Sequence, residues 1–231
     1  MKKYLFLIML LPGWVFAQNR QVIEAASGDD LSGKVSTTMQ YLFPEFTPGE
    51  VYFVNAPKGN GMLNYNMLVG EMQFKENGEV LGLADVKNVA VVNINNRRFY
   101  PFNNQGEFTE ELLSTDKAQL RIRRKGNVAP YAKKGAYGTS SSTSSITSYS
   151  SVNSGDRQYN LSVTSDVLIS LRNFYYLVGA NGKYIQVTNV KAFTKLFPAH
   201  RAQIEAFAKE RKIRFNNEAE LITMLIYCSE L

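Results

Sequence analysis

The sequence predicts an α+β protein in which C-terminal helices pack on a twisted antiparallel β-sheet. Two observations favour this fold class. Between residues 41 and 187, apolar side chains mostly recur at every second position, the period of a half-buried strand. After residue 188 they recur at the spacing of a helix face. The chain has 231 residues and a hydrophobic content of 45%, so residues 39–231 are expected to form a single domain.

The first 17 residues have the layout of a secretory signal peptide. The positive start MKK precedes the apolar run YLFLIMLL, and small or apolar residues lead up to Ala17. A membrane anchor is the alternative, but the apolar run is too short and too broken for a span of about 20 residues. We expect cleavage after Ala17, so that the processed protein is exported, is not transmembrane, and is periplasmic, outer-membrane-associated or secreted.

The next segment, residues 18–38, is rich in small and polar side chains and contains AASGDDLSG. It shows little apolar periodicity. We therefore expect a mobile N-terminal segment.

Residues 41–123 predict an antiparallel meander of six or so strands with one polar face. Leu63, Tyr65 and Met67 alternate with Asn64 and Asn66, which predicts a strand with one apolar and one polar side. A later stretch, residues 120–123, alternates in the same way.

Turn signals separate these strands. Asn77-Gly78 and Asn95-Asn96 predict tight hairpin turns, because asparagine and glycine tolerate positive φ. Pro48-Gly49 and residues 59–61 are also interpreted as turns. Residues 108–113 are interpreted as a short helix.

The C-terminal part combines a hairpin with helices. The runs NFYYLV and KYIQV flank the loop GANG, which is a hairpin signal. The helices follow, with Pro198 suited to a first helical turn. Asn217 and Glu220 resemble a capping box before the last helix.

Residues 138–155, GTSSSTSSITSYSSVNSG, form a serine-rich segment inside this strand-rich chain. Serine and threonine lack the apolar area that would offset the entropy lost on ordering. We expect a long surface loop, and a flexible interdomain linker is the alternative.

The sequence offers few residues for nucleophilic or metal chemistry. His200 is the single histidine and Cys228 the single cysteine. A catalytic triad or a zinc site would lack its usual partners. We predict a surface histidine, a buried inert thiol, and neither a metal nor another cofactor.

Pairs of carboxylates remain a second possibility, because glycosidases need only two acids at the right separation. Glu71, Glu79, Asp85 and Asp166 lie in or near predicted strands. Glu110-Glu111 is interpreted as a pair of solvated charges.

The clearest charge feature is RIRRKGNVAPYAKKGAYG, in a chain whose formal net charge is +6. Its basic and aromatic residues form a candidate partner-binding patch: Arg121, Arg123, Arg124, Lys125, Tyr131, Lys133, Lys134 and Tyr137. It could bind an acidic glycan, a lipid headgroup or another envelope protein. Nucleic acid is disfavoured by the predicted export. The alternative is a solvated strand edge guarded by charge.

Several stretches carry a family resemblance: VFAQ at the end of the signal, YLFPEFTPGEVYF, LNYNMLVGEMQF, VAVVNINNRRFYPF and KKGAYGTSSST. With the closing LFPAHRAQIEAFAKERKIRFNNEAELITMLIY, they resemble a group of uncharacterised secreted proteins of Bacteroidota. The resemblance implies export from a Gram-negative cell. It implies no established activity and no functional residue.

These observations predict an exported envelope or surface protein that is a non-catalytic binding or assembly module. The alternative is a carboxylate-dependent hydrolase of envelope polymers or glycans. A purely structural envelope subunit is a third possibility.

Overall fold

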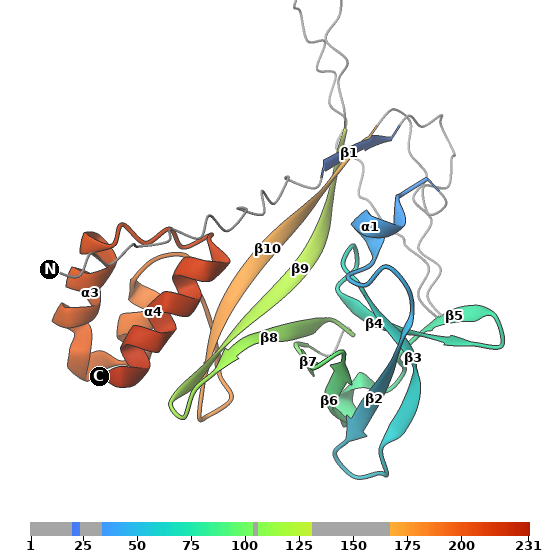
Figure 1. Cartoon of the computed structure of the whole chain (residues 1–231), viewed down its shortest axis with the longest axis horizontal. Coiled ribbons are helices and arrows are strands. Elements are labelled where there is room, and N and C mark those ends of the chain that lie inside the picture. The colour runs from blue at the N-terminus through green and yellow to red at the C-terminus, as the bar shows by residue number, and fades with distance from the viewer. Residues whose placement is uncertain (1–19, 24–33, 104–105, 131–166) are drawn as a thin grey trace, which may run out of the picture.

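The computed structural model describes residues 20–23, 34–103, 106–130 and 167–231. The predicted signal peptide and the serine-rich segment, residues 138–155, lie outside these ranges. In Figure 1 the sheet occupies most of the molecule and the C-terminal helices gather beside the long β9–β10 pair.

The described residues contain eleven strands in one antiparallel sheet. The strands are β1 (Arg20–Ile23), β2 (Thr47–Phe53), β3 (Gly59–Asn66), β4 (Glu71–Glu76), β5 (Glu79–Gly82), β6 (Val89–Ile94), β7 (Arg97–Pro101), β8 (Phe108–Ser114), β9 (Ala118–Pro130), β10 (Val167–Gly179) and β11 (Tyr184–Gln186). Their order in the sheet is β1-β10-β9-β8-β7-β6-β2-β3-β4-β5, and β11 also pairs with β10.

The helices are fewer and short. They are α1 (Thr37–Gln40), α2 (Lys191–Leu196), α3 (Arg201–Glu210), α4 (Glu218–Glu230) and the 3₁₀ turns Val86–Asn88 and Pro198–His200. The predicted antiparallel sheet with C-terminal helices is therefore confirmed. Because the sheet dominates, the chain is mostly β rather than an even α+β mixture.

The sheet is open but strongly curled. An isolated antiparallel bridge joins Glu71 to Glu107, and Phe108 N donates to Gly70 O at 2.8 Å. The Tyr65 hydroxyl crosses the inside of the curl and donates to the backbone oxygens of Phe108 (3.1 Å) and Arg124 (3.2 Å). The curl encloses one apolar core: Phe43, Val51, Leu63, Tyr65, Met67, Met72, Val89, Val92, Ile94, Phe99 and Phe108.

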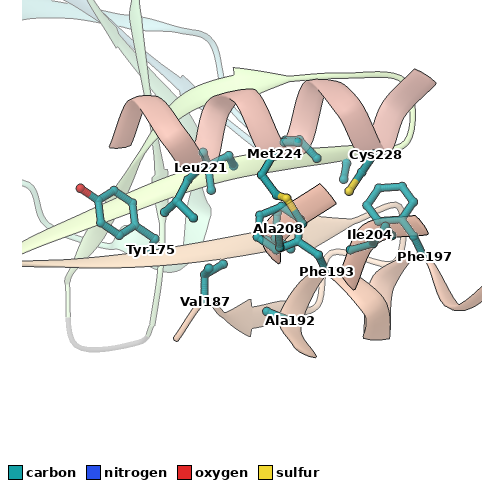
Figure 2. Packing of buried hydrophobic residues seen from close by; sticks show 14 of the residues in the cluster. Tyr175, Val187, Ala192, Phe193, Phe197, Ile204, Ala208, Leu221, Met224 and Cys228 are labelled. Carbon is teal, nitrogen blue, oxygen red and sulfur yellow. The ribbon is translucent and has the colours of Figure 1, made fainter. Parts of the chain in front are cut away.

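A second core lies between the helices and the end of the β9–β10 pair. Leu120 and Ile122 of β9 and Leu177 of β10 are fully buried in it. Figure 2 shows α4 lying over this core, with Met224 and Cys228 pointing toward Phe193 and Ile204. Strand β8 contributes to both cores, with Phe108 in the first and Leu112 and Leu113 packed against the second.

Local turn chemistry agrees with the sequence. Asn95 and Asn96 take φ of 48° and 62° between β6 and β7, so the predicted two-residue turn is confirmed. Asn77 and Gly78 likewise join β4 and β5 at positive φ. The β10–β11 hairpin is also as predicted.

The predicted capping box forms only in part. The Asn217 side chain accepts from Glu220 N at 3.1 Å, as a cap should. The Glu220 carboxylate instead accepts hydrogen bonds from the backbone N–H and the side-chain Nε of Arg214.

Three local predictions are wrong. Pro48-Gly49 lies inside β2, and residues 59–61 begin β3. Residues 108–113 are β8, not a helix. FTEELL has good helix formers, but pairing with β7 and β9 overrides propensity where the strand is buried.

The predicted polar side of β3 is also buried. Asn64 and Asn66 are 1% and 0% exposed. The segment before β2 covers them, and Asn64 pairs with the backbone of Phe43 through hydrogen bonds of 3.2 and 2.9 Å. Part of the predicted mobile segment, Arg20–Ile23, is likewise paired with β10.

Candidate functional site

The basic residues of the predicted patch that the structure describes lie on β9. This strand pairs with β8 on one side and β10 on the other, so it is not an edge. Arg121 is 8% exposed. The interpretation of this stretch as a solvated strand edge is therefore wrong, because strand pairing covers both of its sides. Tyr131, Lys133, Lys134 and Tyr137 lie outside the described residues.

Alternation along β9 separates the basic side chains. Leu120 and Ile122 face the helical core, and Arg124 lies on the same face. Arg121, Arg123 and Lys125 point to the opposite face. The sequence prediction grouped all four, but a strand cannot present them together.

Glutamates of β8 and the residue before it neutralise several of these cations. Glu107 accepts from Arg123 at 2.8 Å and from Lys125 at 2.6 Å. Glu110 pairs with Arg97 and Arg124. The prediction that Glu110 and its neighbour are solvated is wrong, because Glu110 is 3% exposed. The register of β8 against β9 buries it.

Glu111 belongs to the same set, on the face that carries Arg121. It pairs with Arg98 and accepts from the Tyr100 hydroxyl at 3.1 Å. Its side chain is only 6% exposed. Its oxygens are thus occupied although it sits directly across from Arg121 in the register.

Burial and neighbouring charges compete at two carboxyl groups, and their pKa values shift in opposite directions. Burial alone would raise the pKa of Glu107, but the hydrogen bond and charge of Lys125 and the charge of Arg123 lower it overall. Glu218, in the first turn of α4, has a raised pKa because burial outweighs the attraction of Arg124. Glu107 is therefore held ionised.

Aromatic rings surround Arg121 and Arg123. We call this surface the arginine–aromatic face, and it consists of Tyr100, Phe102, Arg121, Arg123, Phe174, Tyr176 and Tyr184. It draws on β7, β9, β10 and β11 and on the residue after β7. All of these rings except that of Tyr176 are half-buried, so each keeps part of its surface accessible.

Arg123 lies between two rings of this face. Its guanidinium carbon is 4.8 Å from the Phe102 ring centre and 4.9 Å from that of Phe174. Its Nε is buried without a hydrogen-bond partner. Cation–π attraction to the two rings compensates in part for the missing acceptor.

Arg121 is held by neutral groups. Its guanidinium carbon lies 3.7 Å from the Tyr100 ring centre. Nε donates to Gln119 Oε1 at 3.0 Å and Nη1 donates to the Tyr184 hydroxyl at 2.5 Å. Within the described ranges, no carboxylate lies at ion-pair distance from Arg121. The charge of this nearly buried guanidinium is therefore stabilised by an aromatic ring and neutral oxygen atoms.

Of the four carboxylates considered for a hydrolase, Glu71 lies directly opposite Glu107 in an antiparallel bridge, and Glu107 is ion-paired with Arg123 and Lys125. Glu107 and Glu110 are buried, but they point to opposite faces of the sheet and each is ion-paired. Glu79 and Asp85 are exposed, and Asp166 lies outside the described residues.

The remaining candidates for chemistry are inert in their surroundings. Cys228 is fully buried, and burial raises the pKa of its thiol to about 12. His200 is half-buried, with Nδ1 3.0 Å from Gln203 Oε1. Over the described ranges, no cluster of three or more His, Cys, Asp or Glu residues could hold a metal ion.

Comparisons with known proteins identify no relative. Neither protein-family models, nor curated proteins, nor solved structures match the chain. In the part of the chain that is described, no helix has both the length and the apolar character needed to cross a membrane. The site is therefore judged on its own geometry.

The sequence prediction missed the aromatic half of the site. Phe174 and Tyr176 stand at alternate positions in NFYYLV, which was interpreted only as one arm of a hairpin. They alternate with Tyr175, which is buried in the helical core, and this alternation indicates that Phe174 and Tyr176 share the opposite face of the strand. Tyr100, Phe102 and Tyr184 join them only through strand register.

Proposed function

We propose that this chain is an exported, non-catalytic envelope or surface protein that binds a ligand through the arginine–aromatic face. The observation that supports it most is Arg121, a nearly buried cation with neutral partners, in a surface of partly accessible rings. Such a surface offers both apolar contact and directed hydrogen bonds.

The charge of this face fits an acidic partner. Arg121 and Arg123 belong to it, and three further cations of the described residues lie next to it: Arg98, Lys125 and Arg172. Among the described carboxylates, Glu107 and Glu111 pair with some of these cations. Complementary charge steers association and fixes the register of a bound partner.

The signal-peptide pattern of residues 1–17 supports export, and the resemblance noted above agrees with an envelope location. A non-catalytic role is supported by the ion-paired state of Glu107 and Glu110. Carboxylates held by arginine or lysine are poor proton donors.

Cosedimentation of the purified protein with isolated Gram-negative envelopes tests the proposal. Arg172 is exposed and contacts the Phe174 ring at 5.7 Å. Arg172→Glu should weaken retention by at least roughly fivefold, since it reverses a charge on the proposed surface. Lys209→Glu, an equal charge change on the exposed side of α3, is the matched control.

Equal retention of both variants and the wild type would show that this face is not the binding surface. Loss of retention in both variants alike would show that only net charge matters, which also contradicts the proposal.

A further inference from the structure

The guanidinium of Arg121 has unused hydrogen-bonding capacity. An arginine carries five N–H donors. Three are used: Nε and one N–H of Nη2 donate to Gln119, and one N–H of Nη1 donates to Tyr184. One N–H on each terminal nitrogen therefore has no partner within the described ranges.

Two N–H groups on the terminal nitrogens of one guanidinium match the spacing of the two oxygens of a carboxylate. The guanidinium is also fixed in place. Tyr100 supports it from one side, and Gln119 and Tyr184 hold its edge. A donor that is already oriented loses little entropy when it binds a ligand.

Neutral hydrogen-bonding groups lie beside this donor. The Tyr184 hydroxyl is 3.2 Å from Thr109 Oγ1 and 3.4 Å from Pro101 O. The rings of Phe102 and Tyr184 meet edge to face at 5.1 Å. Thr109 is buried and holds the Tyr184 hydroxyl in place, whereas the rings of Phe102 and Tyr184 are partly accessible and suit a ligand that has an apolar ring face.

We infer that the arginine–aromatic face binds a uronic-acid-containing polysaccharide, with Arg121 as the contact for the sugar carboxylate and the surrounding rings as a stacking platform. The inference rests on the proposed function and names its ligand class. The sugar carboxylate supplies the missing counter-ion of Arg121, and the C–H face of the sugar ring lies against an aromatic ring.

A lipid headgroup fits this face less well than a sugar acid does. Its phosphate would pair with the guanidinium as readily as a carboxylate does, so the rest of the ligand decides between them. A lipid would also need an apolar surface for its chains. The large exposed apolar residues among those described lie elsewhere: Val22, Val54, Met62, Val80 and Ile226.

Binding measured by calorimetry against defined polymers tests the inference. Polygalacturonate should bind. Its carboxyl-reduced, neutral counterpart should bind roughly tenfold to a hundredfold more weakly, the cost of losing a charged hydrogen-bonded pair. This comparison needs no variant and so does not depend on how a substitution folds. Dextran sulfate and poly-glutamate serve as controls for charge alone and for an acidic peptide.

Variants locate the contact. Arg121→Gln should lower affinity for polygalacturonate by a similar factor. Arg121→Lys, which keeps the charge but loses the paired donors, should recover only part of it. Arg201→Gln in α3 is the matched control and should bind as the wild type does. Circular dichroism establishes that each variant is folded.

Three results would overturn the inference. They are equal binding of the carboxyl-reduced polymer, binding of dextran sulfate or poly-glutamate as tight as that of polygalacturonate, and unchanged affinity in folded Arg121→Gln. Retention on whole envelopes that is sensitive to Arg172→Glu, without binding to polygalacturonate, would reject this ligand class and leave the proposed function standing.

Discussion

Glu107 shows how a buried charge can be tolerated at the surface of a curled sheet. It is 5% exposed and accepts from Arg123, Lys125 and Asn103. Removing one member of such a set leaves an uncompensated buried charge, which is more costly than the intact set is stabilising. The side chain is therefore a sensitive probe of the network between β8 and β9.

Glu107 should make the stability of the protein depend on acidic pH. Its folded-state pKa lies below the ordinary value of 4.5, so it stabilises the fold above that value and the contribution is lost as pH falls through the folded pKa. Glu107→Gln should be less stable at neutral pH and lose less stability between about pH 5 and about pH 3. Urea denaturation at a series of pH values measures the slope.

The control for this experiment is Glu79→Gln in β5, where the side chain is exposed. It should leave the pH dependence of the wild type almost unchanged. If the profile of Glu107→Gln runs parallel to that of the wild type over the same range, then Glu107 is not held ionised as described.

At the scale of elements, the turn between β3 and β4 approaches the backbone of β9 closely at Gly126. Its backbone N–H donates to Leu68 O at 2.9 Å. A Cβ at this position would lie 2.9 Å from the same oxygen and 3.0 Å from Leu68 Cα. Neither atom belongs to a flexible side chain, so the curl of the sheet requires glycine here.

Gly126→Ala should destabilise the fold by about 1–3 kcal/mol, because the two backbones must move apart. Gly61→Ala in β3 is the matched control, since its added Cβ would meet only Leu63 Cδ2 at 4.0 Å. That variant should be neutral or slightly stabilising, because alanine restricts the unfolded chain more than glycine does. Urea midpoints compare the two, and equal midpoints would refute the close approach.

Some elements could be predicted because their signals are local. Asn95-Asn96 and Asn77-Gly78 encode their turns in two residues, and the period change after residue 188 marks the helices. The strand at residues 108–113 could not be predicted from its local sequence, because its conformation depends on pairing with segments on both sides. The turn predicted at Pro48-Gly49 is wrong for a similar reason, because pairing with β3 and β6 keeps these residues extended.

The site was predicted only in part for the same physical reason. The basic composition of residues 121–138 placed Arg121 and Arg123 in a candidate partner-binding patch. It could not show which glutamates would oppose them, because that depends on the register of β8 against β9. It also could not bring Tyr100 together with Tyr176 and Tyr184, since Tyr100 lies on β7, far in the sequence from the β10–β11 hairpin that carries the other two.

At the scale of the whole molecule, residues 1–17 carry a predicted export signal. We expect the mature protein to start at Gln18, because the MKK start, the apolar run and the small residues up to Ala17 are typical of a cleaved signal. N-terminal sequencing of protein from the native host measures this directly. An intact Met1 on exported protein would contradict the cleavage site.

The place of β1 in the sheet determines when the fold can be completed. Arg20–Ile23 is the earliest strand among the described residues, yet its partner is Val167–Ser170 of β10. The hairpins between β3 and β8 need only nearby residues, so they can form as soon as they leave the ribosome or the export channel. The backbone of β1 therefore stays unpaired, and open to chaperones or proteases, while the roughly 150 residues up to its partner are synthesised.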